Sequence, residues 1–360
     1  MRRVLAAVLA LFALASVSTA RSEDAVFVYN WADYIDESLL PRFEKATGLK
    51  LVYDTFDTTD AVEERLLAGA SGYDVVATSG LFLARQRRNN VFQALDRARL
   101  PNLRHLSPAI AALAQKFDPG GTLAVPYLWG TIGLGFDRAK ILERVPEAPL
   151  GSLAMIFDPD IIERLADCGV AVPDSQADTI PAALRYLGLD PDSKDPKVLA
   201  RAEELLKRIR PFVAKFESNI IEELASGEVC LALAYSGDVR QAAAKVRGAE
   251  GADIEYRIPD EGAAVWFDLL AVPADAANIV EAHRFLDYML DPEVAAKIAA
   301  KVGFASPNAG ASALIPASLR GDASNYPPAD IVAKLYAVGP YDARAEREIT
   351  RIWMRLKGRP

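Results

Sequence analysis

The chain has 360 residues, of which 51% are hydrophobic and 25% are charged, and its formal net charge is −8. This length exceeds what one hydrophobic core usually supports, so we expect two lobes, and the composition is that of a globular protein. The acidic balance argues weakly against a nucleic-acid partner and is compatible with a positively charged solute, but it identifies nothing by itself.

The first twenty residues have the layout of a secretory signal peptide. Arg2 and Arg3 precede an apolar run from Val4 to about Ala15, and Ser18-Thr19-Ala20 offers small residues for cleavage. The run is too short to span a bilayer, and charged residues interrupt every later apolar run. We therefore assign residues 1–20 to a signal peptide and expect an exported, soluble, periplasmic protein.

Residues 25–34 are predicted to form a buried strand that is followed by a loop. The loop carries Trp31, Asp33 and Tyr34, at the edge where ligands bind in open α/β sheets. An indole, a carboxylate and a phenol can lie against an alkyl chain and hold a positive charge at its tip. Trp31 could equally belong to the core, and Asp33 could serve only as a turn residue.

Strand and helix patterns then alternate, which predicts a mainly parallel sheet with helices on its faces. We expect Ser38 to cap a helix that Gly48 ends. Ser79 stands at the carboxyl end of a later strand, at the same rim as the first loop. The expected elements are strands over residues 49–54 and 73–78 and a helix over residues 58–70.

Two long extended segments read as strands that cross between the lobes. They cover Leu123–Phe136 and Gly262–Pro273, and glycines in such segments allow close approach and bending. Gly133-Leu-Gly135 lacks the third glycine of a dinucleotide-binding fingerprint. In the second segment Asp268 interrupts an apolar run, and a buried acid is costly unless it is paired or functional.

A second alternating block lies between these crossings, over residues 157–248. Its apolar strand Val229–Ala234 leads to Tyr235 and Asp238, so an aromatic ring and a carboxylate again face a rim. Asp238 could equally cap the helix that follows. The remaining expected elements are helices over residues 158–167, 178–188, 196–209, 219–226, 280–290 and 343–356 and a strand over residues 254–258.

The chain has two cysteines, Cys168 and Cys230. In an oxidising compartment such a pair favours a disulfide over a redox or metal site, and the alternative is two buried thiols.

Catalytic patterns are absent from the sequence. The chain has two histidines, His105 and His283, and neither stands in a metal-binding or nucleophile motif. The one enzyme hypothesis that the residues allow is a hydrolase that uses Asp33 and Asp238 as its pair of carboxylates, and nothing in the sequence supports it. We expect no enzyme, no metal and no cofactor.

Taken together, several motifs resemble the periplasmic polyamine-binding proteins of ABC transporters, closest to the putrescine-binding branch. The resemblance extends over nearly the whole mature chain, in order. The motifs are Tyr29-Asn-Trp-Ala-Asp-Tyr-Ile35, Tyr73-Asp-Val-Val76 with Ser79, Pro126-Tyr-Leu-Trp-Gly-Thr131, Ser236-Gly-Asp238, Trp266-Phe-Asp268 and Tyr326-Pro-Pro-Ala-Asp330.

This resemblance implies an α/β, two-lobed fold of the type II periplasmic binding protein class. The ligand cleft lies between the lobes, and crossing strands form the hinge. The implied domains are lobe 1 over residues 25–131 plus about 262–303, and lobe 2 over residues 132–261 plus about 304–360.

The resemblance also implies the ligand-binding residues. Those that match aromatic walls or acids facing ammonium groups are Trp31, Tyr34, Trp266, Asp33, Asp238 and Asp268. Ser79 matches a hydroxyl contact, and Tyr235 stands where the putrescine branch has a tryptophan. A diamine is apolar in the middle and charged at both ends, so its burial requires aromatic faces and hydrogen-bonded carboxylates.

Four positions depart from the family pattern. Ala32 replaces a serine or threonine, Asp178 replaces a longer glutamate, Tyr235 replaces tryptophan and Phe304 lacks the hydroxyl of a tyrosine. Arg240 could also pair with the nearby acid at position 238. These changes leave the implied fold and role intact but loosen the assignment of putrescine as the ligand.

The implied function is that of a monomeric binding component which captures a di- or polyamine, putrescine favoured, and delivers it to an inner-membrane ABC permease. The alternatives are a longer polyamine such as spermidine, another cationic amine, or a ligand-dependent sensor.

Overall fold

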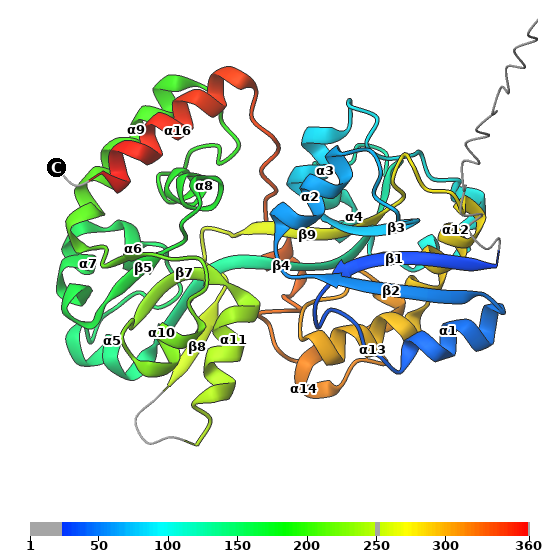
Figure 1. Cartoon of the computed structure of the whole chain (residues 1–360). Helices are drawn as coiled ribbons and strands as arrows, with labels where there is room; N and C mark the ends of the chain where they lie inside the picture. The colour runs from blue at the N-terminus through cyan, green and yellow to red at the C-terminus, as the bar shows by residue number, and fades with distance from the viewer. Residues whose placement is uncertain (1–23, 249–252, 359–360) are drawn as a thin grey trace, which may run out of the picture.

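The computed structural model of the protein describes residues 24–248 and 253–358, so the predicted signal peptide lies outside the described residues. Within them, buried side chains gather in two large clusters, each the core of one lobe. The lobes stand side by side in Figure 1, as the length of the chain predicted.

Lobe 1, on the right in Figure 1, has a core that includes Val28, Phe82 and Phe285. It combines the first part of the chain with a later segment. Its elements are β1 (Ala25–Trp31), α1 (Leu39–Thr47), β2 (Lys50–Phe56), α2 (Thr59–Leu67), β3 (Val75–Ser79), α3 (Gly80–Gln86), η1 (Arg97–Arg99), η2 (Pro101–His105), α4 (Pro108–Ala114), α12 (Ile279–Met289), α13 (Pro292–Val302), η5 (Ala309–Ala311) and α14 (Ala317–Arg320).

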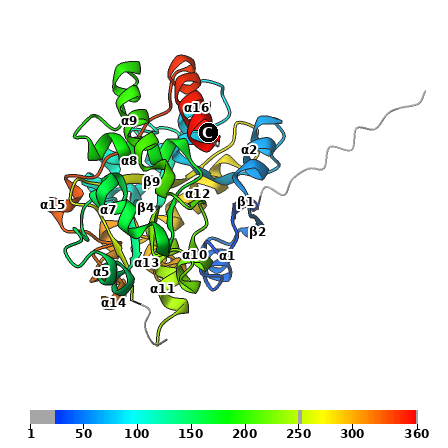
Figure 2. The same cartoon turned by 90° about the vertical axis from the view of Figure 1, so that its left-hand side faces the viewer.

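Lobe 2 has a core that includes Phe136, Phe157 and Leu206. Its elements are α5 (Arg138–Arg144), α6 (Ala154–Phe157), α7 (Pro159–Leu165), η3 (Ala166–Cys168), β5 (Val170–Val172), α8 (Gln176–Tyr186), α9 (Pro196–Ile209), η4 (Arg210–Phe212), β6 (Lys215–Phe216), α10 (Ile221–Ser226), β7 (Leu231–Tyr235), α11 (Ser236–Lys245), β8 (Ile254–Arg257) and α16 (Ala343–Lys357). Figures 1 and 2 both show α16 beside α9. The short helix α15 (Ala329–Val332) precedes the final return of the chain to lobe 2.

A single sheet runs through both lobes. β4 (Ala124–Asp137) and β9 (Ala264–Ala271) are antiparallel neighbours at its centre, in the order β2-β1-β3-β9-β4-β7-β5-β6. The first part of β4 pairs with β9, and its last residues pair with β7 and β8. Both predicted crossing strands are therefore confirmed, because β4 and β9 each contribute buried side chains to the cores of both lobes.

Of the two predictions for the ends of α1, the one for Gly48 is confirmed and the one for Ser38 is wrong. Gly48 ends α1 in the left-handed conformation, at φ 74°, as predicted. Ser38 is not a side-chain cap: it has helical backbone angles and its side chain makes no capping hydrogen bond. Its N–H instead donates to Oδ1 of Asp36 at 3.0 Å. The prediction for Ser38 was wrong because an Asx turn at Asp36 begins the helix.

The residue boundaries of the lobes stay a prediction. α14 lies beside α13 in Figure 1, and the two pack through an apolar cluster that includes Ala299, Ile315 and Leu319. This packing favours a return of the chain to lobe 2 after α14, later than residue 304.

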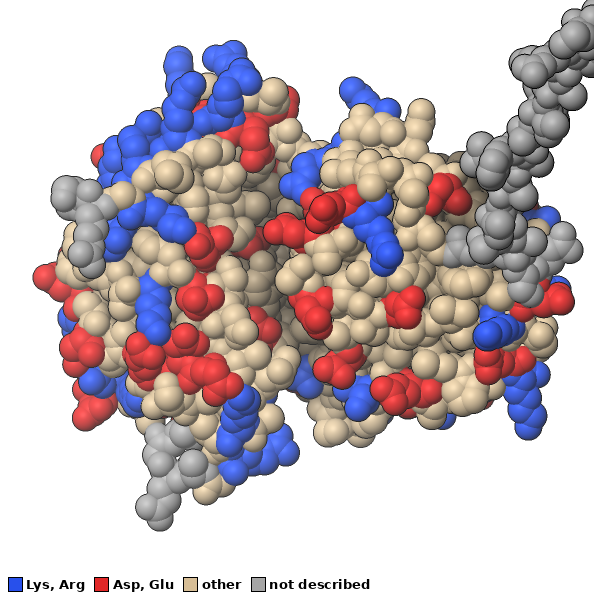
Figure 3. Space-filling model, viewed as in Figure 1, with Lys and Arg blue, Asp and Glu red and all other residues tan. Residues whose placement is uncertain are grey.

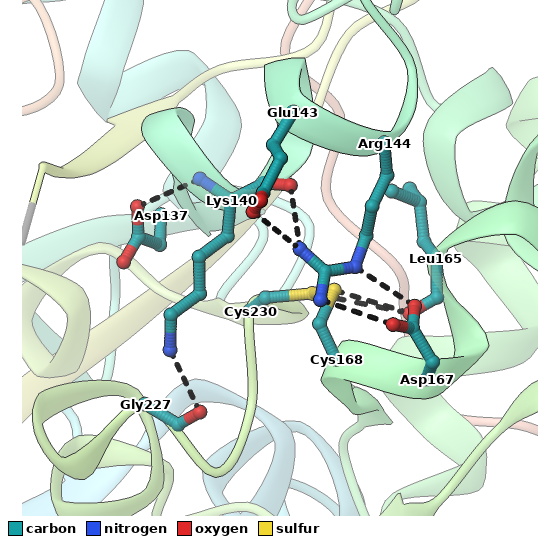
Figure 4. The surroundings of a disulfide bond; sticks show 9 residues. All are labelled: Asp137, Lys140, Glu143, Arg144, Leu165, Asp167, Cys168, Gly227 and Cys230. Carbon is teal, nitrogen blue, oxygen red and sulfur yellow. Dashed lines mark hydrogen bonds and ion pairs between the residues drawn. A yellow bond between two sulfur atoms is a disulfide. The ribbon is translucent and has the colours of Figure 1, made fainter.

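A disulfide joins Cys168 to Cys230 inside lobe 2, as predicted, and excludes the alternative of two thiols. Figure 4 shows Arg144 beside it, paired with Asp167 at 2.8 Å. Among the described helices, none has both the length and the apolar character needed to span a bilayer.

Candidate ligand-binding site

The two lobes enclose a cavity at their junction. Figure 3 shows the surface hollowed between them. The cavity has a volume of about 210 Å³. Ser79 and Phe117 line it from lobe 1, Asp178 and Tyr235 line it from lobe 2, and Trp266 on β9 lies between them. A cavity with walls from both lobes changes its shape when the lobes move.

Trp266 lies flat against the backbone of the other crossing strand. It is opposite Gly130 in the β4–β9 register, and a Cβ added at Gly130 would stand 2.5 Å from the indole ring. Only glycine leaves room for the ring at this point. The indole nitrogen Nε1 of Trp266 is buried and has no hydrogen-bond partner in the described residues.

Three aromatic rings form a continuous row with this indole. The ring centroids of Trp31 and Tyr34 are 6.3 Å apart, and those of Tyr34 and Phe304 are 5.8 Å apart. Phe304 meets the ring of Trp266 edge-on at 4.9 Å. The structure thus brings the three predicted wall residues Trp31, Tyr34 and Trp266 together with Phe304, which was also predicted as a site residue.

Asp268 adds a buried carboxyl to this row. It follows Trp266 by two residues on β9, so both side chains leave the same face of the strand, and it pairs in register with Ser79 on β3. Its exposed fraction is 8%, and the hydroxyl of Tyr34 donates to its Oδ2 at 2.9 Å.

Burial raises the pKa of Asp268 from 3.8 to about 7, and the hydrogen bond from Tyr34 and the nearby indole of Trp31 partly offset this rise. The Trp31 indole N–H itself forms no hydrogen bond with any residue that the structure describes. Within the described residues, Asp268 forms no ion pair with a lysine or arginine. Its charge is therefore available to a cation that enters the site.

Asp238 is the third residue of α11 and does not cap the helix, since the cap position belongs to Tyr235. Burial raises its pKa from 3.8 to about 6. Arg240 does not pair with it: the guanidinium contacts the carbonyl of Gly303 and lies 3.3 Å from Asp322. The possible neutralisation of Asp238 by Arg240 is thus excluded.

Asp178 lies in the first turn of α8 and contacts Tyr235. The Tyr235 hydroxyl donates to Oδ2 of Asp178 at 2.8 Å. Burial raises the pKa of Asp178, and hydrogen bonds from Ser175 and Tyr235 oppose that rise. After burial, the charge of Asp178 and its hydrogen bond raise the pKa of Tyr235 most, and the charges of Asp238 and Asp268 add to this rise.

Two predicted site residues, Asp33 and Ser79, have positions that do not by themselves indicate ligand binding. Asp33 is exposed, in the left-handed conformation at φ 58°, and no hydrogen bond in the described part of the chain joins it to the other acids. Ser79 lines the cavity, but its hydroxyl also caps α3 by accepting the N–H of Phe82 at 3.2 Å.

Phe117, Val338 and Tyr127 lie at the site but were not predicted from the sequence. Phe117 and Val338 line the cavity. Tyr127 on β4 donates its hydroxyl to the carbonyl of Tyr34 and fixes the loop after β1. Tyr127 stands in the motif Pro126-Tyr-Leu-Trp-Gly-Thr131, and the alternation of side chains along that strand was the signal that could have found it.

This arrangement suits an elongated cation and does not suit a metal. Aromatic faces provide an apolar wall, and buried carboxyls that form no ion pair within the described residues provide charged ends. Over residues 24–248 and 253–358, no group of three or more histidine, cysteine, aspartate or glutamate side chains is arranged to hold a metal ion.

A family model described as "bacterial extracellular solute-binding protein" matches residues 38–325. The chain belongs to this family. Its members are transport proteins that bind solutes, and the family is not one of enzymes.

Curated members of this family are similar over almost the whole chain. The putrescine-binding periplasmic protein SpuD of Pseudomonas aeruginosa is 41% identical over 347 residues, which cover 96% of this chain and 95% of SpuD. The putrescine-binding periplasmic protein PotF of Escherichia coli is 39% identical over 352 residues, covering 97% of this chain and 95% of PotF. The resemblance predicted from the sequence is confirmed.

Solved structures of the family share the fold. The spermidine/putrescine substrate-binding protein PotD of Streptococcus pneumoniae superposes with a TM-score of 0.81 at 26% identity, covering 93% of this chain and 98% of PotD. The predicted two-lobed, α/β periplasmic binding protein fold is therefore confirmed.

Proposed function

We propose that this protein captures a di- or polyamine, putrescine favoured, and delivers it to the permease of an ABC transporter. The observation that carries the proposal is Asp268, a buried carboxyl on β9 that has no lysine or arginine partner in the described part of the chain and accepts a hydrogen bond from the phenol of Tyr34. Relatives at about 40% identity that are named for putrescine binding support it.

The proposed contacts follow from the chemistry of a diamine. Trp31, Tyr34, Trp266 and Phe304 would face the methylene chain, whose burial is favourable by ~0.8 kcal/mol per CH₂. The ammonium groups would donate charge-assisted hydrogen bonds to carboxylates at each end of the row, namely Asp268, Asp238 and Asp178, with Asp33 and Ser79 as further predicted contacts.

The cavity also gives a reason to test longer ligands. Its volume is about 210 Å³, and its lining includes Trp266 and the Asp178–Tyr235 pair but neither Asp268 nor Phe304. A longer polyamine such as spermidine could place an additional ammonium group there. Putrescine remains favoured because relatives at 41% and 39% identity are named for binding it.

A screen of amines by thermal unfolding tests the proposal. A true ligand raises the melting temperature by mass action, equivalent to roughly 2.7 kcal/mol at one hundred times its Kd. Putrescine, cadaverine, spermidine and agmatine are compared with 1,4-butanediol, which has the length of putrescine but no charge. We expect putrescine to give the largest shift and butanediol none. No shift and no calorimetric binding with any amine would contradict the proposal.

We further propose that residues 1–20 direct export and that the mature protein works as a periplasmic monomer. The periplasmic location of the relatives supports this. Edman sequencing of protein recovered from a periplasmic extract checks it, with a new N-terminus expected after Ala20. Retention of Met1 in the extracted protein would refute the cleavage.

A further inference from the structure

A lysine of lobe 1 and an aspartate of lobe 2 meet across the junction. Lys116 follows α4, and its Nζ lies 2.6 Å from Oδ2 of Asp192. Phe117, the next residue, belongs to the core of lobe 1. Asp192 follows α8, close to Leu189, which packs against the core of lobe 2. The ion pair therefore joins the two lobes directly.

Asp192 is fixed by further contacts. Its Oδ1 accepts the backbone N–H of Gly339 at 3.0 Å and lies 3.5 Å from Nζ of Lys194. Its side chain is 16% exposed and that of Lys116 is 42% exposed. The Lys116 stem lies along the backbone at Gly339, where an added Cβ would stand 3.0 Å from Cε. The carboxylate of Asp192 thus contacts both Lys116 of lobe 1 and the backbone of Gly339, in the segment between α15 and α16.

The neighbours of this ion pair are walls of the cavity. Phe117 follows Lys116 and Val338 precedes Gly339, and both line the cavity that holds Asp178 and Tyr235. Phe117 also packs so closely on Gly80 that a Cβ there would stand 2.7 Å from its ring. A change in the ion pair therefore acts on the cavity through two apolar side chains.

We propose that Lys116 and Asp192 form a latch, the ion pair that holds the lobes closed over a bound ligand and positions Phe117 and Val338 at the cavity. Neither residue lines the cavity, so both are positioning residues. The latch rests on the proposed function in that a ligand binds between the lobes. An opening motion separates residues of different lobes and breaks this pair, whereas ion pairs inside one lobe persist.

The variants Lys116→Gln, Asp192→Asn and their combination test the latch, with Lys207→Gln as the matched control. Lys207 forms an equally short ion pair, 2.7 Å from Glu203, but both partners lie on α9. Stopped-flow fluorescence gives the association and dissociation rate constants, with the ligand that most stabilises the wild-type protein in the amine screen.

We expect each latch variant to raise the dissociation rate constant about 3- to 10-fold, the effect of losing a partly exposed ion pair. The double variant should be no worse than either single variant, because both remove the same contact. High salt should reduce the difference from wild type, since it screens an exposed pair. The ligand-free melting temperature should match that of the Lys207→Gln control.

Rate constants equal to those of Lys207→Gln would overturn the latch, as would additive effects in the double variant. A loss of binding that follows a lowered ligand-free melting temperature would assign the pair a general structural role and would also overturn it. These failures are distinct from failure of the proposed function, in which the wild-type protein itself binds no amine.

Discussion

Asp268 lies in a strand that is otherwise apolar, and only 8% of its surface is exposed. Removing a carboxylate from water costs several kcal/mol unless partners compensate. The Tyr34 hydroxyl supplies one hydrogen bond, and burial still holds the pKa of Asp268 near neutrality. A carboxyl this unfavourable for folding supports the proposed role of Asp268 as the partner of a bound cation.

The first prediction concerns Asp268→Asn. An amide of the same shape keeps the packing but loses the charge, so we expect diamine binding to weaken by roughly 2–5 kcal/mol, the cost of truncating one partner of a buried charge pair. Isothermal titration calorimetry measures the change. Asp160→Asn, on the exposed first turn of α7, is the control. Equal diamine affinity of the Asp268→Asn and Asp160→Asn variants would show that Asp268 is not a ligand-binding residue.

The second prediction concerns pH. Burial raises the pKa of Asp268 to about 7 and that of Asp238 to about 6, both from 3.8. A dication favours the ionised carboxylates, so below these values binding must release protons. We expect diamine affinity to fall as pH falls from about 8 to 5, and calorimetry in buffers of different ionisation enthalpy to show proton release at pH 6. A flat profile would contradict this.

The same two shifts have the opposite consequence for the ligand-free protein. A carboxyl with a raised pKa binds more protons in the folded state than in the unfolded state. Its contribution to the free energy of unfolding is therefore greatest at low pH and is lost as pH rises through about 6 to 7. Acidification thus favours the empty protein and disfavours the complex.

Site residues differed in how far the sequence could reveal them. Trp31 and Tyr34 follow a readable strand, so their rim position was predictable from local pattern alone. Phe304 stands in no such pattern, and only family resemblance singled it out. Its contact with Trp266 depends on how distant segments pack, and no local periodicity encodes that. For Asp33, strand and turn signals do not distinguish a ligand contact from the exposed turn observed here.

At the scale of elements, the site depends on the close pairing of β4 and β9. The third prediction is that Gly130→Ala destabilises the protein by roughly 1–3 kcal/mol, the usual cost of overpacking, and weakens ligand binding, because the new Cβ meets the Trp266 ring at 2.5 Å. Urea unfolding and calorimetry measure both effects.

A double-mutant cycle with Trp266→Leu supplies the control for Gly130→Ala. If the clash is with the indole, the alanine should cost much less stability once the ring is absent. An unchanged cost in the Trp266→Leu background would show that Gly130 is needed for another reason.

Helices and strands with clear periodicity were predictable, and their ends less so. The helix predicted over Pro196–Ile209 matches α9 at both ends, since Asp195 caps it and its apolar residues keep helical spacing. α13 was missed, although Asp291, Pro292 and Gly303 are ordinary start and stop signals for a helix. The sequence therefore contains the signals that are needed to predict α13.

At the scale of the whole molecule, the contacts that matter join distant parts of the chain. Lys116 and Asp192 are ordinary surface residue types, and their pairing arises only once the two lobes are placed. The sequence could predict that two lobes exist, from length and from the crossing strands, but not which side chains meet between them. The disulfide is different, since two cysteines allow one pairing.

That disulfide gives the last prediction. Both cysteines belong to lobe 2 and are 62 residues apart, for which the chain-entropy model gives about 4 kcal/mol of stabilisation. We expect the Cys168→Ser, Cys230→Ser double variant to lose roughly 2–4 kcal/mol, all of it from lobe 2. Differential scanning calorimetry without ligand should then show lobe 2 unfolding before lobe 1.

A ligand that contacts both lobes links their unfolding, because it is released when either lobe unfolds. Saturating amine should therefore raise the lower transition of the double variant and bring the two transitions together. Reduction of the wild-type disulfide should reproduce the split and serves as the control. A single, unsplit transition in the ligand-free double variant would mean that the lobes unfold as one unit, held by β4 and β9 without help from the ligand.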